Sequence, residues 1–156
     1  MTGVTDELYS LLVPISGSRL IVPRVCVAEV SGLGQLNLLE HGPDWLIGKV
    51  GWKGRELPLV CFEVACGGPL PEIGRRTRAV IFHATTQLHG GFFAILSQGL
   101  PQLVRINASV VSSESGEDWP EGAPVLCRIR MVNEYPIVPD LDSIESMLTD
   151  TASDWR

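Results

Sequence analysis

Residues 45–62 read WLIGKVGWKGRELPLVCF, and this stretch decides the class of fold. An apolar run from Trp45 to Val50 is followed by Gly51-Trp52-Lys53-Gly54, and a second strand-like run extends from Arg55 to Phe62. Two β-favouring runs joined by a short glycine-containing segment are typical of a β-hairpin. The stretch lacks the 3.6-residue period of a long amphipathic helix. It therefore predicts an antiparallel pair of strands.

The same pattern continues on both sides of this hairpin. Leu8 to Ile15 and Arg19 to Val22, separated by a short loop with glycine, predict another hairpin. Arg78 to Ala84 is almost continuously apolar, as expected of a strand that is covered on both faces. Further strands are predicted at Phe92 to Leu96, Leu103 to Val111, Val125 to Val132 and Tyr135 to Val138. About nine or ten short strands predict an all-β fold of small barrels or a sandwich.

Helices are expected at two places. A short helix is predicted from Pro23 through Val30, because proline is tolerated in the first turn of a helix. Asp140 is expected to cap a short C-terminal helix, whose apolar residues share one face: Leu141, Ile144 and Leu148. Helical segments between the strands are missing, which argues against an alternating βαβ architecture.

Three segments are expected to lie outside the regular elements. Glycine and proline punctuate residues 32–43, which predicts a long loop. Residues 67–77 are also rich in glycine and proline, and they are the most plausible boundary between two halves of the chain. The polar tail at residues 150–156 is expected to be loose, although Trp155 has the option of docking on the core.

Length and charge limit the classes of function. The chain has 156 residues, so it is long enough to fold without a disulfide or a metal. Its formal charge is −6. No signal peptide is recognisable, and no apolar run approaches the roughly 20 residues that cross a bilayer. We therefore expect a cytoplasmic protein with reduced cysteines and no direct membrane insertion. The acidic balance and the aromatic content of 6% argue against nucleic acid as a partner.

One basic cluster interrupts the acidic sequence. Arg75, Arg76 and Arg78 follow the turn-like residues Pro71-Glu72-Ile73-Gly74. One interpretation is a solvated loop that leads into a strand. The other is a patch that binds an anion or an acidic partner.

No catalytic, cofactor or metal site is predicted. Cys61 and Cys66 have a spacing that a zinc knuckle can use, but a second close pair of ligands is missing. Phosphate-binding glycine loops and a nucleophile elbow are also missing from the sequence. His83 lies within an apolar strand-like run, which is typical of a structural histidine. A small cytoplasmic enzyme that uses a Cys or His at the junction of two β-barrels stays open as an alternative.

The two tryptophans of the central hairpin admit two interpretations. Trp45 and Trp52 flank the hairpin turn, and tryptophan is enriched at binding hot spots. The other interpretation is that one or both of these tryptophans fill the core. An exposed Trp52 at the tip of a turn indicates a partner.

At this point the chain resembles a known family, the CheW-like coupling proteins of bacterial chemotaxis. In the segment Pro43 to Phe62 the positions similar to the family signature are Gly48, Lys49-Val50, the turn Gly51-Trp52-Lys53-Gly54 and Pro58. Val27-Ala28-Glu29-Val30 is similar to the V-x-E-V/I element of the family, and Gly99-Leu100 to its Asp-Gly-Val turn. Pro139 to Leu148 resembles the closing region. The order and spacing of these elements carry the resemblance over nearly the whole chain.

The resemblance implies a fold and a function. The fold is all-β, with two intertwined five-stranded SH3-like barrels and a short C-terminal helix. The CheW-like domain would cover residues 7–149, with two subdomains that meet near 67–77, followed by the tail at 150–156. The implied function is that of a non-enzymatic adaptor without a cofactor. It joins the cytoplasmic tip of a methyl-accepting chemoreceptor to the regulatory domain of a CheA-type histidine kinase.

Six residues are expected to bind partners, either because they match the family signature or because they lie at the tip of the hairpin turn: Val27, Glu29, Gly48, Trp52, Lys53 and Leu100. Gly48 has an alternative role as a residue that the backbone geometry requires, and Val27 and Leu100 are equally compatible with the core. Lys53 replaces the turn arginine of the family, and a lysine lacks the two-pronged hydrogen bonding of arginine. The chain is in this respect similar to divergent CheW-like proteins of type IV pilus chemosensory clusters, which serve twitching motility.

Overall fold

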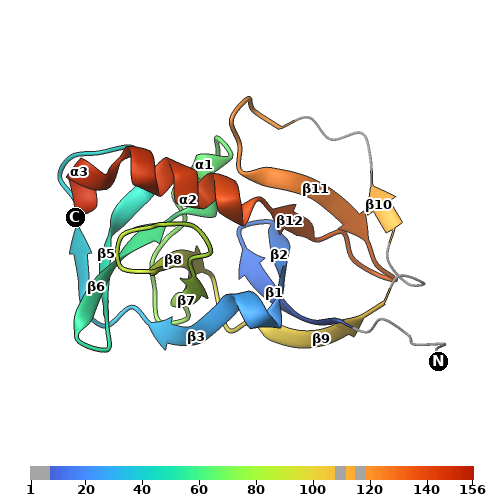
Figure 1. Cartoon of the computed structure of the whole chain (residues 1–156). Coiled ribbons are helices and arrows are strands. Elements are labelled where there is room, and N and C mark those ends of the chain that lie inside the picture. The colour runs from blue at the N-terminus through green and yellow to red at the C-terminus, as the bar shows by residue number, and fades with distance from the viewer. Residues whose placement is uncertain (1–7, 108–111, 115–118) are drawn as a thin grey trace.

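The computed structural model describes residues 8–107, 112–114 and 119–156. In this part of the chain the strands form two six-stranded β-sheets that lie side by side (Figure 1). The predicted mostly-β fold with two sheets and a short C-terminal helix is confirmed. Each sheet has one strand more than the predicted five-stranded barrel. The additional strand has three residues and lies at one edge: β4 in one sheet and β10 in the other.

One sheet, called here the terminal sheet, is built from both ends of the chain, with the order β10-β11-β12-β2-β1-β9. Its strands are β1 (Leu8–Ile15), β2 (Ser18–Pro23), β9 (Gln102–Ile106), β10 (Ser112–Glu114), β11 (Val125–Arg130) and β12 (Ile137–Pro139). β1 and β2 form the hairpin that the sequence predicts, with Leu12 opposite Ile21. β9 pairs with the other edge of β1 and β12 runs parallel to β2, so distant segments complete the sheet. Residues 108–111 of the strand predicted at Leu103 to Val111 lie outside the described residues.

The other sheet, called here the central sheet, has the order β3-β7-β8-β6-β5-β4. Its strands are β3 (Val27–Gly32), β4 (Leu36–Leu38), β5 (Leu46–Trp52), β6 (Arg55–Val60), β7 (Arg78–His83) and β8 (Phe92–Ser97). β5 and β6 are the hairpin predicted from residues 45–62. β6 and β8 are parallel neighbours, with Leu59 opposite Ala94.

The central sheet is buried on both faces, which explains its continuous apolar strands. In β7, Val80 and Phe82 belong to a cluster that also contains residues of the terminal sheet and of the C-terminal helix. Ala79 and Ile81 point to the other side, into a core formed by the central sheet alone. A smaller cluster around Leu12 fills the interior of the terminal sheet.

The C-terminal helix α2 (Leu141–Asp150) lies over the cluster between the sheets (Figure 1). The carboxylate of Asp140 caps it by accepting a hydrogen bond from the backbone N–H of Ser143 at 3.0 Å. Ile144 and Leu148 are completely buried, as the spacing predicts. No helix in residues 8–107 and 119–156 is long and apolar enough to span a membrane.

The tail after α2 is ordered, which corrects the expectation that it is loose. Ala152–Trp155 form a short helix, α3, and the indole N–H of Trp155 donates to the carbonyl of Leu148 at 2.9 Å. Trp155 is buried in the cluster between the sheets. Burial of this large apolar ring favours the ordered conformation of the short segment.

The helix predicted from Pro23 to Val30 is wrong. A single 3₁₀ turn, η1 (Arg24–Cys26), follows Pro23, and the chain then enters β3. Val27 and Val30 are β-branched and pair with Phe82 and Val80 of β7. Strand pairing with a buried neighbour therefore overrides the weak helical signal of the proline.

The segment proposed as a subdomain boundary, residues 67–77, follows the short helix α1 (Phe62–Ala65). Strands on both of its sides, β6 and β8, pair within the central sheet. The chain passes from one sheet to the other at residues 24–26 and at 98–101 instead. A division into two folding units near 67–77 stays a prediction.

Candidate partner-binding site

The turn of the central hairpin presents Lys53 at its tip. β5 ends at Trp52, β6 begins at Arg55, and these two residues are paired, so Lys53 and Gly54 form a two-residue loop. Their φ angles are +47° and +76°, and positive values at both positions are typical of the type I′ turn. Gly54 adopts this conformation without a Cβ penalty, whereas Lys53 is the one non-glycine residue with positive φ in the described chain. The backbone therefore fixes the direction in which the Lys53 side chain leaves the sheet.

Glu29 of β3 contacts both neighbours on this hairpin. Its carboxylate accepts a hydrogen bond from the indole N–H of Trp52 at 3.1 Å. The other carboxylate oxygen lies 3.9 Å from the Nζ of Lys53, whose ammonium group is 5.0 Å from the centroid of the Trp52 ring. These three residues are called the Glu29–Trp52–Lys53 cluster below.

The cluster is accessible to a partner. The side chains of Lys53 and Glu29 keep 68% and 44% of their surface exposed, so their ion pair contributes little to the stability of the fold. Trp52 is half-buried against the core of the central sheet. Its indole is therefore held in one orientation while part of its surface faces solvent, which is the property of a preorganised contact residue.

Aromatic and cationic groups from β6 and β8 extend the cluster. Phe92 packs edge-on against Trp52, with 4.9 Å between ring centroids, and the guanidinium of Arg55 lies 5.5 Å from the Phe92 ring. Arg55 also donates to the carbonyl of Gly90 at 3.2 Å. Sequence reasoning missed Phe92 and Arg55, because it placed them in separate strands. The parallel pairing of β6 with β8 brings them together.

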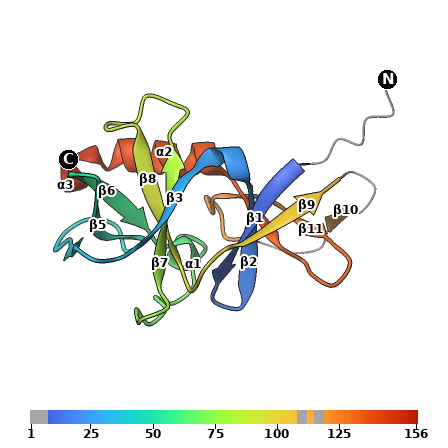
Figure 2. The same cartoon turned by 90° about the horizontal axis from the view of Figure 1, so that it is seen from below.

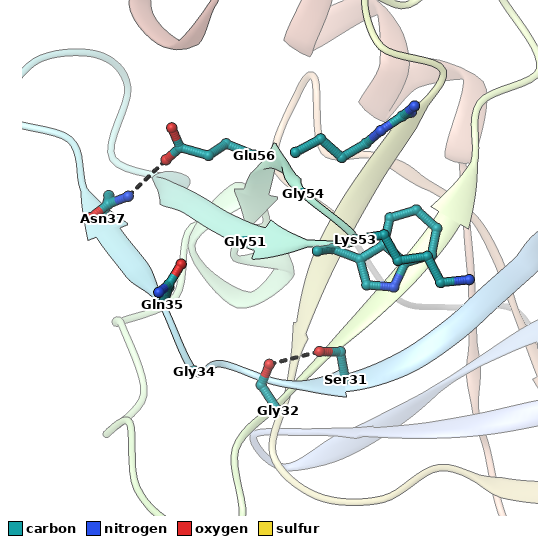
Figure 3. A pocket seen from close by; sticks show the side chains of 11 residues that line it. Ser31, Gly32, Gly34, Gln35, Asn37, Gly51, Lys53, Gly54 and Glu56 are labelled. Carbon is teal, nitrogen blue, oxygen red and sulfur yellow. Dashed lines mark hydrogen bonds between the residues drawn. The ribbon is translucent and has the colours of Figure 1, made fainter.

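A cavity of about 760 Å³ adjoins the cluster (Figure 3). The end of β3, the connection to β4 and the β5–β6 turn form its walls, and Gly32, Gly34 and Gly54 leave space in it. Its polar residues include Gln35 and Asn37, and the amide of Asn37 donates to Glu56 at 2.7 Å. Trp52 and Lys53 are among the residues that line this open depression, whose lining is about equally polar and apolar.

The other three predicted site residues have different positions. Gly48 is buried in β5, where an added Cβ would lie 2.3 Å from the backbone oxygen of Asn37, so packing alone requires glycine there. Val27 is on β3, two residues before Glu29, and packs against the cluster between the sheets. Leu100 is 71% exposed in the connection from β8 to β9, at the opposite end of β8 from Phe92. The structure thus brings Glu29, Trp52 and Lys53 together and leaves Gly48 and Leu100 apart.

Three of the cysteines, Cys26, Cys61 and Cys66, are poorly suited to nucleophilic chemistry. Burial raises the pKa of Cys61 to about 12 and that of Cys66 to about 11, and the nearby carboxylate of Glu63 adds to both effects. Burial also raises the pKa of Cys26. A thiol with a raised pKa holds little thiolate at neutral pH, and the thiolate is the nucleophile. Within the described residues, no group of three or more Cys, His, Asp and Glu side chains is arranged to hold a metal ion.

Fold and site together define a class: a two-sheet β-protein whose helix α2 covers the junction of the sheets and whose central hairpin carries the partly exposed Glu29–Trp52–Lys53 cluster. Comparison with known proteins gives this class a name. The family model described as the CheW-like domain matches residues 10–126, and the chain belongs to this family. No curated protein sequence matches the chain significantly.

A solved structure supports the same fold. The crystal structure of the scaffolding protein TtCheW from Thermoanaerobacter tengcongensis aligns with a TM-score of 0.70 at 10% sequence identity. The alignment covers 85% of this chain and 88% of that one. Because the identity is low, the alignment carries the fold and not the detailed surface.

Proposed function

We propose that this protein is a non-enzymatic, cytoplasmic adaptor that couples chemoreceptors to a CheA-type histidine kinase. The observation that carries the proposal is the exposed Glu29–Trp52–Lys53 cluster on a scaffold of the CheW-like family. The partners are the cytoplasmic tip of a methyl-accepting chemoreceptor and the regulatory domain of the kinase. The system served is chemotaxis or, given the divergent turn, twitching motility driven by type IV pili.

Each member of the cluster has a separate part in partner binding. Trp52 supplies a large, partly buried ring that gains affinity when a partner covers its remaining exposed surface. Glu29 orients that ring through the indole hydrogen bond. Lys53 offers a single mobile positive charge, which contributes to steering and specificity more than to raw affinity. Val27, two residues before Glu29 on β3, would extend this contact, whereas Leu100 at the other end of β8 would contact a partner separately.

The affinity of the purified protein for the receptor hairpin and for the kinase regulatory domain tests this proposal. By isothermal titration calorimetry, we expect Trp52→Ala to weaken one of the two interactions by about a hundredfold, or about 3 kcal/mol. Lys53→Glu should weaken the same interaction by about tenfold, because the reversed charge also repels Glu29.

Two further variants separate charge from turn geometry. Lys53→Asn removes the charge but tolerates positive φ, so it should weaken binding less than Lys53→Glu without lowering stability. Lys53→Arg restores the residue of the family signature and should strengthen binding. Binding of both partners with unchanged affinity by a folded Trp52→Ala protein would remove the cluster from the interface.

A further inference from the structure

A second exposed surface lies at the far end of the central sheet. The connection from α1 to β7 ends in a turn at residues 72–77, called here the basic turn. In the register of β7 and β8, Arg78 pairs with Ser97 next to this turn, whereas His83 pairs with Phe92 at the end where Trp52 packs. Figure 2 shows the connection into β7 on the lower side of the molecule and the β7–β8 connection on the upper side. The two surfaces are therefore separated by the length of the strands.

Internal hydrogen bonds hold the backbone of the basic turn. Thr77 is buried, its hydroxyl accepts from the N–H of Gly74 at 2.8 Å, and its own N–H donates to the Gly74 carbonyl at 3.2 Å. The guanidinium of Arg78 donates to the carbonyls of Arg75 and Thr77 at 2.7 and 3.0 Å. A turn that is closed in this way presents its side chains without a large cost in ordering on binding.

The charges of this turn are not neutralised within the described chain. Arg75 and Arg76 are exposed, and among residues 8–107, 112–114 and 119–156 no ion pair or hydrogen bond engages their guanidinium groups. With Gln98 they line a depression of about 560 Å³, in which Glu72 is the one carboxylate among the described lining residues. Gln98 is itself fixed, because its backbone N–H donates to the Pro14 carbonyl at 2.8 Å. A local excess of positive charge thus stands on a protein whose formal charge is −6.

We propose that the basic turn is a second docking surface, which binds an acidic segment of a protein partner. Two unengaged guanidinium groups on adjacent residues match carboxylates, with which they form two-pronged hydrogen bonds. Ile73 is 42% exposed in the same depression, and it offers apolar contact to a side chain of the same segment. This inference rests on the proposed adaptor function only for the identity of the protein that supplies the segment.

Protein is favoured over nucleic acid as the source of the negative charge. Among the described residues no aromatic side chain lines the depression, so that part of the chain offers bases nothing on which to stack. The net negative charge of the molecule repels a polyanion outside the immediate turn. A short acidic segment engages the two arginines without meeting that repulsion.

The test uses a synthetic peptide in which Glu and Leu alternate, titrated into the ¹⁵N-labelled full chain and followed by NMR. We expect shift changes confined to residues 70–78 and Gln98, and an affinity that falls several-fold between low and about 0.5 M salt. Arg75→Glu combined with Arg76→Glu should weaken binding at least tenfold, whereas Trp52→Ala should leave it unchanged. A peptide with Gln in place of Glu is the matched control and should bind at least tenfold more weakly.

Three outcomes would overturn the inference: shift changes elsewhere, equal binding of the Gln peptide, or tighter binding of a single-stranded oligonucleotide to the same turn. The same Arg75→Glu/Arg76→Glu variant is then measured against the kinase domain and the receptor hairpin. If wild-type protein binds neither of these but binds the acidic peptide at the turn, the adaptor function fails and the docking surface stands. If it binds both partners but not the peptide, the docking surface fails and the adaptor function stands.

Discussion

At the scale of single residues, the backbone of the β5–β6 hairpin constrains two positions, one in the turn and one within β5. Lys53 occupies the first position of a type I′ turn with φ of +47°, so its side chain has a fixed exit from the sheet. Gly48 allows β5 to approach β4, because any side chain there would overlap the backbone of Asn37. Gly48 and Lys53 both match positions of the family signature, but their surroundings differ. Gly48 is required by packing, whereas Lys53 is exposed.

Replacement of Gly48 separates a packing role from a contact role. We expect Gly48→Ala to lower the free energy of unfolding by about 1 to 3 kcal/mol, because the added Cβ would lie 2.3 Å from the Asn37 oxygen. Urea denaturation measures this change. Gly32→Ala is the matched control, since nothing lies within 4 Å of its added Cβ. Equal stability of the two variants would show that β4 does not approach β5 as described.

At the scale of elements, α2 is attached to the β7–β8 connection mainly through Glu145, and the carboxylate of Asp142 also accepts from the Thr85 hydroxyl at 3.2 Å. Glu145 is 1% exposed, and its oxygens accept from the N–H groups of Thr85 and Thr86 at 2.9 to 3.1 Å and from the Thr86 hydroxyl at 2.6 Å. The same connection supplies the Gly90 carbonyl that binds Arg55 beside Phe92. The C-terminal helix therefore supports the connection that borders the Glu29–Trp52–Lys53 cluster.

Loss of the Glu145 charge should loosen this attachment. We expect Glu145→Gln to lower the free energy of unfolding by about 2 to 3 kcal/mol, because an amide cannot accept all of these hydrogen bonds. Hydrogen exchange of the Thr85 and Thr86 amides should accelerate. Asp150→Asn, an exposed acid-to-amide change on the same helix, should leave both quantities nearly unchanged. Slow exchange at Thr85 in the Glu145→Gln protein would contradict the account.

The elements that the sequence predicts correctly are those defined by local pattern. The hairpins β1–β2 and β5–β6 follow from apolar runs around glycine, and α2 follows from its cap and spacing. β3 and β4 were missed in part, because pairing with β7 and β5 creates them within segments that look helical or loop-like. In the site, Trp52 and Lys53 were identifiable at the turn. Phe92 and Arg55 were not, since the parallel contact of β6 with β8 joins segments far apart in the chain.

At the scale of the whole molecule, both sheets and helix α2 contribute to one buried cluster, and the Glu29–Trp52–Lys53 cluster and the basic turn lie at opposite ends of the central sheet. An adaptor of the proposed kind would couple two partners by holding both in fixed geometry, and the coupling is a binding free energy. Cys61 is buried in the core, and Cys26, Cys66 and Cys127 are partly buried. The raised thiol pKa values of Cys26, Cys61 and Cys66 make the thiol-enzyme alternative less favourable than the adaptor.

The thiols should show this burial in their pH dependence. With pKa values raised from 9.0 to about 12 for Cys61 and about 11 for Cys66, alkylation by iodoacetamide at pH 7 should be slow at both. These thiols stay neutral in the folded protein but ionise near pH 9 once unfolded. Their contribution to stability is therefore complete below pH 9 and is lost as pH rises toward 11 to 12. Rapid, selective alkylation of either cysteine at pH 7 would favour the enzyme alternative.

The central claim is that one molecule of this protein bridges a receptor and a kinase. Sedimentation velocity of the protein mixed with a receptor signalling hairpin and a CheA-type regulatory domain tests it most directly. The account predicts a ternary complex that is absent when the protein is omitted and that is depleted by Trp52→Ala. Mutually exclusive binding, in which the kinase domain displaces the receptor hairpin from the folded protein, would contradict it.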